Sequence, residues 1–301
     1  MDTLVVILGP TGVGKTELCL QIAKHLNIPI INADSRQIYA ELPIGTAAPT
    51  SEDQQQVFHY FVGNHKIEDY YSASLFESHV MSLLKKKLLK ENHIALMCGG
   101  SMMYIDAVCY GIDDIPTINE QTRTFMQQQL QEKGLPALAE KLKQVDPEYY
   151  EIVDRNNPRR VVHALEICYK TGRTYTSFRT HTTTNRPFRI IKIGLNRDRE
   201  IMYQRINDRV LAMMKDGLEQ EARKVYPYKG LNALNTVGYK ELFDYFEHKI
   251  PLQEAVRQIQ SNTRRYMRKQ LTWFKKDENI QWFHPDNIKE IINYIDKTIE
   301  I

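Results

Sequence analysis

Several hallmarks of membrane, secreted and zinc-binding proteins are missing from this 301-residue sequence. No apolar run approaches the roughly 20 residues of a membrane-spanning helix, and the first run, Leu4 to Leu8, is too short for a signal peptide. The 4 cysteines show no C-x-x-C spacing and no paired histidines, so neither a zinc site nor a disulfide framework is indicated. We therefore expect a reduced, cytoplasmic protein that does not bind a membrane.

Acidic side chains are almost absent from two segments, although the whole chain has a net charge of only +3. Residues 155–192 contain nine Lys or Arg and one acid, and residues 264–276 contain six Lys or Arg and no acid. Aromatic residues are interleaved with this charge: Tyr169, Tyr175, Phe178, Phe188, Tyr266, Trp273 and Phe274. One such segment could be a solvated helix face. Two of them favour a polyanion partner, with rings available for packing or base stacking.

The first hundred residues alternate between strand and helix patterns. Strands are predicted at 3–8, 28–33 and 94–97, and helices at about 15–26 and 73–91. This alternation predicts a parallel sheet with helices on both faces, and therefore an α/β fold.

A different pattern begins near Pro116. Residues 116–187 are dominated by helix signals, so we predict an inserted all-α domain between a first core part, 1–115, and a second, mainly helical part, 188–301. The second part is expected to contain a strand at 189–195, a long helix at about 251–276, a short segment at 280–283 and a terminal amphipathic helix. The Thr-rich residues 180–185 are predicted to form a loop.

A phosphate-binding loop lies between the first strand and the first helix. Its residues fit G-x-x-x-x-G-K-[ST] and are Gly9, Pro10, Thr11, Gly12, Val13, Gly14, Lys15 and Thr16. Glycines let backbone N–H groups surround an anion, and the helix N-terminus adds partial positive charge. Lys15 can reach a terminal phosphate, and the Thr16 hydroxyl can ligate Mg²⁺. The loop therefore predicts a bound diphosphate or triphosphate without deciding between them.

The strand that holds a metal-binding carboxylate in ordinary ATP hydrolases lacks one here. Residues 94–97 are followed by Cys98, Gly99 and Gly100, whereas the strand at 28–33 is followed by Asp34. Ligands of open α/β sheets bind beyond the carboxyl ends of the strands, so Asp34 should share a crevice with the phosphates. It could be a metal ligand, a general base or a helix N-cap.

Seven further motifs follow the phosphate loop in a characteristic order. They are NADSRQIY at 32–39, IGTA at 44–47, YSA at 71–73, GGSMMY at 99–104, NPRR…ALE at 157–166, VGY at 237–239, and TR…QLTW at 263–273. Together with the phosphate loop they resemble the bacterial-type tRNA dimethylallyltransferases of the IPP transferase family. The resemblance spans nearly the whole chain, and it implies a P-loop NTPase-like sheet with an inserted helical tRNA-binding domain.

The resemblance implies a reaction as well. In that family a dimethylallyl group moves from dimethylallyl diphosphate to N6 of the adenine 3′ of the anticodon, position 37. The phosphate loop would hold the prenyl donor with Mg²⁺, and Lys15 and Arg209 would stabilise the departing diphosphate. Arg209 could instead form a surface ion pair. Asp34 would be the general base, and Ser101, which replaces the family's Thr, would hydrogen-bond near the reacting amine.

The resemblance further implies contacts to a tRNA anticodon stem-loop, whose adenine would be extruded into the crevice. The implied positions are Asp34, Ser35, Arg36, Gln37, Ser101, Arg123, Arg159, Arg160, Val161, Val162, His163, Asn235, Thr236, Val237, Gly238, Tyr239 and Lys240. His163 and Lys240 stand where the family usually has Arg, and Pro43, Ala48 and Gly63 are further departures. A monomer is expected.

Three other functions remain open from the residues alone. A small-molecule kinase would explain the first hundred residues but not the basic, aromatic segments. A nucleotide-switched RNA-binding protein would explain the charge, but it should carry a metal-binding carboxylate on the third strand. An isopentenyltransferase acting on free adenine nucleotides would share the loop and Asp34, and it would not need a tRNA-binding domain.

Overall fold

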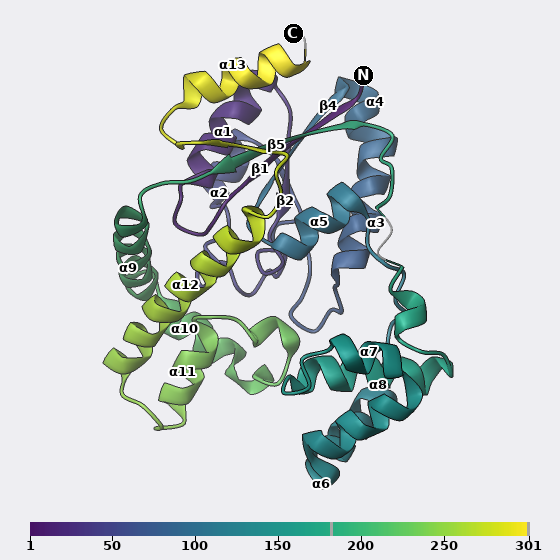
Figure 1. Cartoon of the computed structure of the whole chain (residues 1–301). Helices are drawn as coiled ribbons and strands as arrows, with labels where there is room; N and C mark the ends of the chain where they lie inside the picture. The colour runs from purple at the N-terminus through teal and green to yellow at the C-terminus, as the bar shows by residue number, and fades with distance from the viewer. Residues whose placement is uncertain (181–182, 300–301) are drawn as a thin grey trace. The chain divides into compact units, whose positions relative to one another are not determined.

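A six-stranded parallel sheet organises the part of the chain that the structure, a computed structural model, describes: residues 1–180 and 183–299. The strand order is β3-β2-β4-β1-β5-β6, and every neighbouring pair is parallel (Figure 1). The strands are β1 (Thr3–Leu8), β2 (Ile30–Ala33), β3 (His59–Tyr60), β4 (Ile94–Gly99), β5 (Arg189–Leu195) and β6 (Ile280–Phe283). The predicted parallel α/β fold is confirmed.

The central strand β1 explains why helices cover both faces of the sheet. Its alternate side chains Leu4, Val6 and Leu8 belong to one buried cluster, while Val5 and Ile7 belong to a second. Because successive side chains of a strand point to opposite faces, a strand that is apolar at every position from 4 to 8 must be covered on both faces.

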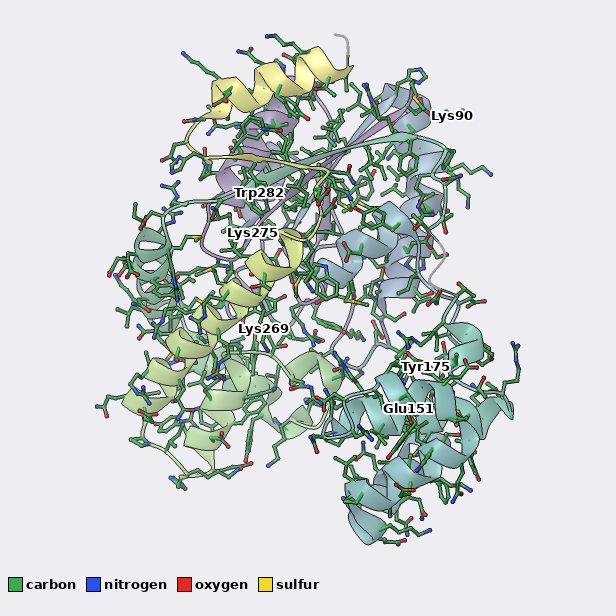
Figure 2. All side chains as sticks on the ribbon, viewed as in Figure 1. Lys90, Glu151, Tyr175, Lys269, Lys275 and Trp282 are labelled. Atoms are coloured by element: carbon green, nitrogen blue, oxygen red, sulfur yellow. The ribbon has the colours of Figure 1, made fainter. Side chains whose placement is uncertain are left out.

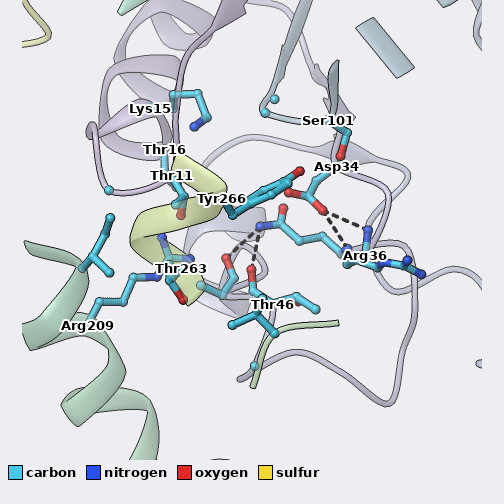
Figure 3. A pocket seen from close by; sticks show the side chains of 18 of the residues that line it. Thr11, Lys15, Thr16, Asp34, Arg36, Thr46, Ser101, Arg209, Thr263 and Tyr266 are labelled. Carbon is cyan, nitrogen blue, oxygen red and sulfur yellow. Dashed lines mark hydrogen bonds between the residues drawn. The ribbon is translucent and has the colours of Figure 1, made fainter. Parts of the chain in front are cut away.

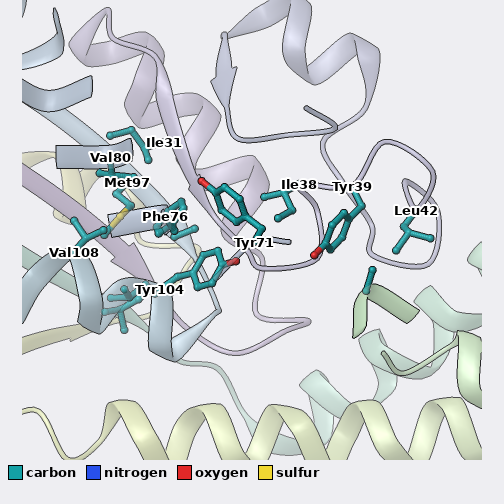
Figure 4. Close-up of a cluster of buried hydrophobic side chains, with 14 of the residues drawn as sticks. Ile31, Ile38, Tyr39, Leu42, Tyr71, Phe76, Val80, Met97, Tyr104 and Val108 are labelled. Atoms are coloured by element: carbon teal, nitrogen blue, oxygen red, sulfur yellow. The ribbon is translucent and has the colours of Figure 1, made fainter. Parts of the chain in front are cut away.

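Helices pack on each face of the core. Figure 1 shows α1 (Lys15–Leu26) and α13 (Ile288–Ile299) on one side of the sheet, and α3 (Ala73–Leu83) and α5 (Met102–Tyr110) on the other. In the cluster beneath α3 and α5, the rings of Phe76 and Tyr104 stack with centroids 4.4 Å apart (Figure 4). The other helices of the core are α2 (Ser51–Gln56), α4 (Leu89–Asn92), α9 (Arg199–Lys215), α10 (Leu218–Val225), α11 (Tyr239–Phe246) and α12 (Leu252–Phe274).

Two predicted elements differ from the observed ones for local reasons. The strand predicted from Ile28 begins only at Ile30, because Asn27 is left-handed with φ 51°, the Ile28 N–H is bonded to Ala23 O, and Pro29 has no N–H to donate. The helix predicted at 73–91 continues from α3 through a π-helical turn, Leu84–Leu88, into α4. It ends where His93 adopts φ 57°.

The described chain divides into two compact units: a core unit, Met1–Tyr110 with Asn185–Ile301, and an inserted unit, Gly111–Thr184. The inserted unit contains α6 (Glu120–Val145), α7 (Pro147–Ile152), α8 (Pro158–Thr171) and a short 3-10 helix, Thr176–Phe178, around its own apolar cluster. The sequence-based boundaries of the inserted domain, 116 and 187, stay a prediction. Positions 181 and 182 of the predicted 180–185 loop lie outside the described residues.

Local sequence explains the ends of the inserted helices. Gly134, with φ 76°, and Pro136 interrupt α6. Asn157 caps α8 by accepting from Arg160 N, and Pro158 occupies the first turn, where its missing N–H has no cost. No helix in the described part of the chain is both long and apolar enough to cross a membrane.

Candidate active site

A cavity of about 780 Å³ opens beyond the carboxyl ends of β1, β2 and β4. The segments that follow these strands line it, together with side chains from α9 and α12 (Figure 3). The cavity therefore lies where open α/β sheets bind their ligands.

The phosphate loop adopts the conformation that its glycines allow. Gly12 and Gly14 have φ of 81° and 107°, a backbone conformation that residues with a Cβ rarely adopt. Lys15 Nζ donates to Gly9 O at 2.9 Å and Pro10 O at 2.8 Å. Burial lowers the pKa of Lys15; Cys98 and Asp34 oppose this shift, and Arg209 adds to it. The surroundings of Lys15 thus disfavour a lone cation, so an anion bound there would be stabilised strongly.

Arg209 faces the same cavity from α9. Burial lowers its pKa, nearby Asp34 raises it, and Arg205 lowers it further. Arg209 forms no salt bridge with any residue that the structure describes, so the alternative of a surface ion pair has no partner there. Neighbouring Arg205 joins α9 to the phosphate loop, because its Nε donates to Gly12 O at 2.8 Å.

Asp34 directly follows β2, and only one of its two carboxylate oxygens accepts hydrogen bonds from the described residues. Its Oδ1 accepts from Arg36 N at 2.9 Å and from Gln37 N at 3.4 Å (Figure 3). Its Oδ2 accepts no hydrogen bond from the residues described. Asp34 therefore caps the turn after β2 rather than a helix, and it retains one oxygen for a ligand or a proton.

Ser101 lies beside Asp34 but is itself only 6% exposed. Its Oγ accepts from Ser35 N at 2.8 Å and donates to Ser35 Oγ at 3.2 Å. This pair of bonds ties the segment after β4 to the segment after β2. Ser101 thus fixes the position of Asp34's neighbours and leaves only its remaining acceptor capacity for other partners.

Sequence reasoning missed a buried glutamine on α12. Gln270 is 2% exposed; its Oε1 accepts from Thr11 N at 2.9 Å, and its Nε2 donates to Gly100 O at 2.8 Å. One amide thereby joins the phosphate loop to the turn after β4. Gln270 lies in the basic segment at 264–276 and in the TR…QLTW motif, but the sequence assigned it no role.

A second missed residue, Glu221 on α10, anchors the loop at 44–47. Its carboxylate accepts from Ile44 N at 2.9 Å, from Gly45 N at 2.8 Å and from the Tyr239 hydroxyl at 2.7 Å. Burial raises the pKa of Tyr239, and Glu221 adds to this shift. A Cβ on Gly45 would lie only 2.5 Å from the Tyr239 hydroxyl, so the loop approaches α11 as closely as glycine permits.

The anchored loop in turn holds Gln37. The Gln37 side chain donates from Nε2 to Thr46 O and to Ala47 O, both at 3.0 Å. The backbone N–H of Gln37 also donates to Asp34. Glu221 is therefore linked to Asp34 through the loop at 44–47 and the side chain of Gln37.

The positions implied to contact tRNA fall into three groups. Asp34, Ser35, Arg36, Gln37, Ser101, Asn235, Thr236, Val237 and Gly238 line the cavity. Arg123, Arg159, Arg160 and His163 are exposed on the inserted unit. Three side chains are buried instead, because Val161 and Val162 pack in the core of the inserted unit and Tyr239 packs in the core unit. These three side chains contribute to folding, so side-chain contacts to tRNA in these segments would come from neighbouring exposed residues. Lys240, next to Tyr239, is exposed.

The two basic segments are less uniform than their charge suggests. Arg186 and Lys192 are 7% and 6% exposed, in ion pairs with Glu77 and Asp277. The aromatic residues Phe188 and Phe274 are also buried. Arg186 and Lys192 therefore do not contribute to a polyanion surface, and Phe188 and Phe274 serve packing, one of the two roles expected of the rings. Exposed cations remain along α12, including Lys269, and at its end, Lys275 (Figure 2).

The fold and the cavity together define a P-loop α/β protein in which two partly buried cations, Lys15 and Arg209, and one carboxylate, Asp34, face one site. A sequence model described as IPP transferase matches residues 37–277 of this chain. The chain therefore belongs to the IPP transferase family.

Individual relatives agree with this assignment. The chain is 58% identical over 295 residues to tRNA dimethylallyltransferase 1 of Phocaeicola vulgatus, covering 98% of each chain. It is 56% identical to tRNA dimethylallyltransferase 1 of Bacteroides fragilis, covering 99% of each. Among solved structures, a tRNA isopentenylpyrophosphate transferase from Bacillus halodurans aligns with a TM-score of 0.73 at 33% identity, covering 100% of this chain and 97% of the other.

Proposed function

We propose that this protein transfers the dimethylallyl group of dimethylallyl diphosphate to N6 of adenine 37 in tRNA. The products are N6-(dimethylallyl)adenosine and diphosphate. One observation carries the proposal: in a chain of the IPP transferase family, Lys15, Arg209 and Asp34 face a single cavity at the phosphate loop.

The proposed reaction uses each of these groups once. The adenine amine attacks C1 of the donor, a C–N bond forms, and the C–O bond breaks with its electron pair passing to the diphosphate. Lys15, Arg209 and the loop N–H groups stabilise the negative charge that develops on the leaving diphosphate. Asp34 accepts the proton from the amine through Oδ2, while Oδ1 remains bonded to the backbone.

The site also suits Mg²⁺. This ion retains several waters and needs few protein ligands when substrate phosphates are present. The described residues contain no cluster of three or more His, Cys, Asp or Glu that could enclose a metal, and the exposed Thr16 hydroxyl lies at the cavity. Thr16 and the donor's oxygens would hold the ion, which would neutralise charge on the diphosphate.

The anticodon stem-loop is the proposed partner of both units. Exposed Arg123, Arg159, Arg160 and His163 on the inserted unit would contact stem phosphates, which position an RNA without reading its sequence. The cavity-lining segments at 34–37 and 235–238, with Lys240, would contact the loop around the extruded adenine. We propose that the protein performs this work in the cytoplasm as a monomer.

The testing assay combines the pure protein, Mg²⁺, dimethylallyl diphosphate and unmodified tRNA, and detects prenylated adenosine by mass. Incorporation into tRNA is the expected result. Incorporation into free AMP but not into tRNA would overturn the tRNA assignment. Turnover of ATP without prenyl transfer would instead indicate a small-molecule kinase.

A further inference from the structure

Tyr266 on α12 is a large side chain in the cavity to which the proposed reaction gives no role. It lines the cavity and is 38% exposed. Figure 3 shows its ring beside Asp34, between that carboxylate and Thr11 of the phosphate loop. The hydroxyl end of the ring points toward Ser101 (Figure 3). Burial raises the pKa of Tyr266 to about 12, and the Asp34 charge adds to the shift. The phenol is therefore neutral, and it presents a ring face rather than a charge.

A base that leaves its stack needs a new flat partner. Extruding even an unpaired loop base loses stacking contacts, and enzymes that accept such bases compensate by stacking them on aromatic or apolar side chains. Aromatic side chains serve this purpose for any base, because every base has a π-face. A cavity that admits an adenine should therefore offer such a ring close to the reacting groups.

Only two aromatic side chains line the cavity among the residues described, Tyr266 and His59. His59 is 7% exposed, and its Nδ1 lies 2.8 Å from Val57 O. Tyr266 thus offers the accessible ring, and that ring lies beside the proposed general base, Asp34 (Figure 3).

We propose that Tyr266 is the stacking face for the acceptor purine and sets the angle at which its amine meets Asp34. This rests on the proposed function, since it assumes that the acceptor is an extruded adenine. The ring of Tyr266 contacts the base, while its hydroxyl end points toward Ser101. Tyr266 is therefore a substrate-binding residue rather than a proton donor or acceptor.

The experiment separates the ring from the hydroxyl. Tyr266→Phe keeps the ring, Tyr266→Leu removes it, and Tyr294→Leu on α13 is the matched control, because Tyr294 packs against Phe283 away from the cavity lining. Loss of one base–aromatic stack lowers kcat/KM for tRNA by about 5- to 150-fold. We expect that loss in Tyr266→Leu, with unchanged affinity for inorganic pyrophosphate, and a much smaller loss in Tyr266→Phe and in Tyr294→Leu.

A spectroscopic signature tests the stacking directly. An anticodon stem-loop with 2-aminopurine at position 37 lacks the N6 amine, so it binds without reacting. Its fluorescence should be quenched on the wild-type enzyme and on Tyr266→Phe, and bright on Tyr266→Leu. Tyr266→Met, also without a ring, replaces the leucine variant if that does not fold.

The outcomes distinguish this inference from the proposed function. If the wild type prenylates tRNA but both ring-less variants match it in kcat/KM and in 2-aminopurine fluorescence, the role of Tyr266 is refuted while the function stands. If the wild type prenylates no tRNA, the proposed function itself fails.

Discussion

Replacing Gln270 by alanine tests how one side chain holds the phosphate loop in place. The amide bonds Thr11 N and Gly100 O at 2.9 and 2.8 Å, although these residues are about 260 and 170 positions away in the sequence. Gln270→Ala leaves both backbone groups without their partner. The same helix provides a matched control, Gln260, whose amide makes a single bond of 3.3 Å to Asn207 O.

The expected loss of unfolding free energy in Gln270→Ala follows from the two backbone groups that lose their hydrogen-bond partner. A buried donor or acceptor that loses its partner costs about 1–3 kcal/mol, so two of them set a range of about 2–6 kcal/mol. Thr11 is half-buried beside an open cavity, so water can partly replace the glutamine there. We therefore expect Gln270→Ala to lose about 2–4 kcal/mol of unfolding free energy and Gln260→Ala no more than about 1 kcal/mol.

Urea unfolding followed by tryptophan fluorescence measures this difference cleanly. Both tryptophans of the chain, Trp273 and Trp282, belong to the core unit, so their signal reports on that unit alone. Affinity for inorganic pyrophosphate should fall in Gln270→Ala as well, because Thr11 N–H belongs to the loop. If Gln270→Ala were no less stable than Gln260→Ala and bound pyrophosphate normally, the bridging role would be wrong.

Four further changes probe other parts of the site. Asp34→Asn keeps the oxygen that caps the turn but cannot take up a proton. The kcat should therefore fall about 10²- to 10⁴-fold while pyrophosphate affinity stays unchanged. Undiminished turnover would exclude Asp34 as the general base. Burial lowers the pKa of Lys15, so pyrophosphate affinity should weaken as the pH rises, beginning at a lower pH than an exposed lysine would set, in the wild type but not in Lys15→Arg. Arg160→Ala should reduce the salt dependence of stem-loop binding by about one unit of log–log slope, and an unaltered slope would remove its phosphate contact. Gly45→Ala places a Cβ 2.5 Å from a tyrosine hydroxyl and should cost about 1–3 kcal/mol in urea unfolding, whereas Gly230→Ala, with nothing within 4 Å, should be neutral.

Sequence patterns predicted the site wherever its chemistry is local. The phosphate loop needs contiguous residues between a strand and a helix, so a single window contains the whole motif. Asp34 was found in the same way, because a carboxylate at the end of a buried strand is visible without any knowledge of pairing. The parallel sheet followed from the spacing of strands and helices.

Residues that act through distant contacts could not be found in this way. Gln270 bonds two backbone groups that lie early in the chain. It belongs to the TR…QLTW motif, but its neighbours in the sequence do not show that its amide makes this bridge. Glu221 looks like an ordinary acid of an amphipathic helix until folding brings it to Gly45. Charge counting was insufficient for a related reason. Arg186 and Lys192 are buried in ion pairs with carboxylates far away in the sequence, so a local surplus of basic residues does not by itself reveal an exposed surface.

Two adjacent glycines give a physical reason for assigning Asp34 to proton transfer rather than to metal binding. A Cβ at Gly99 would lie 2.1 Å from Ala33 O, and one at Gly100 would lie 2.6 Å from Gln270 Nε2. Neither position can carry a carboxylate unless β2 or α12 moves, so the metal-holding acid of an ATP hydrolase has no place at the end of β4. Transfer to an amine needs a group that takes up a proton, whereas Mg²⁺ on a diphosphate can rely on Thr16, phosphate oxygens and water. Of the residues that directly follow β2 and β4, only Asp34 is acidic. Its Oδ2 accepts no hydrogen bond from the described residues, so this oxygen is open for the proposed proton transfer.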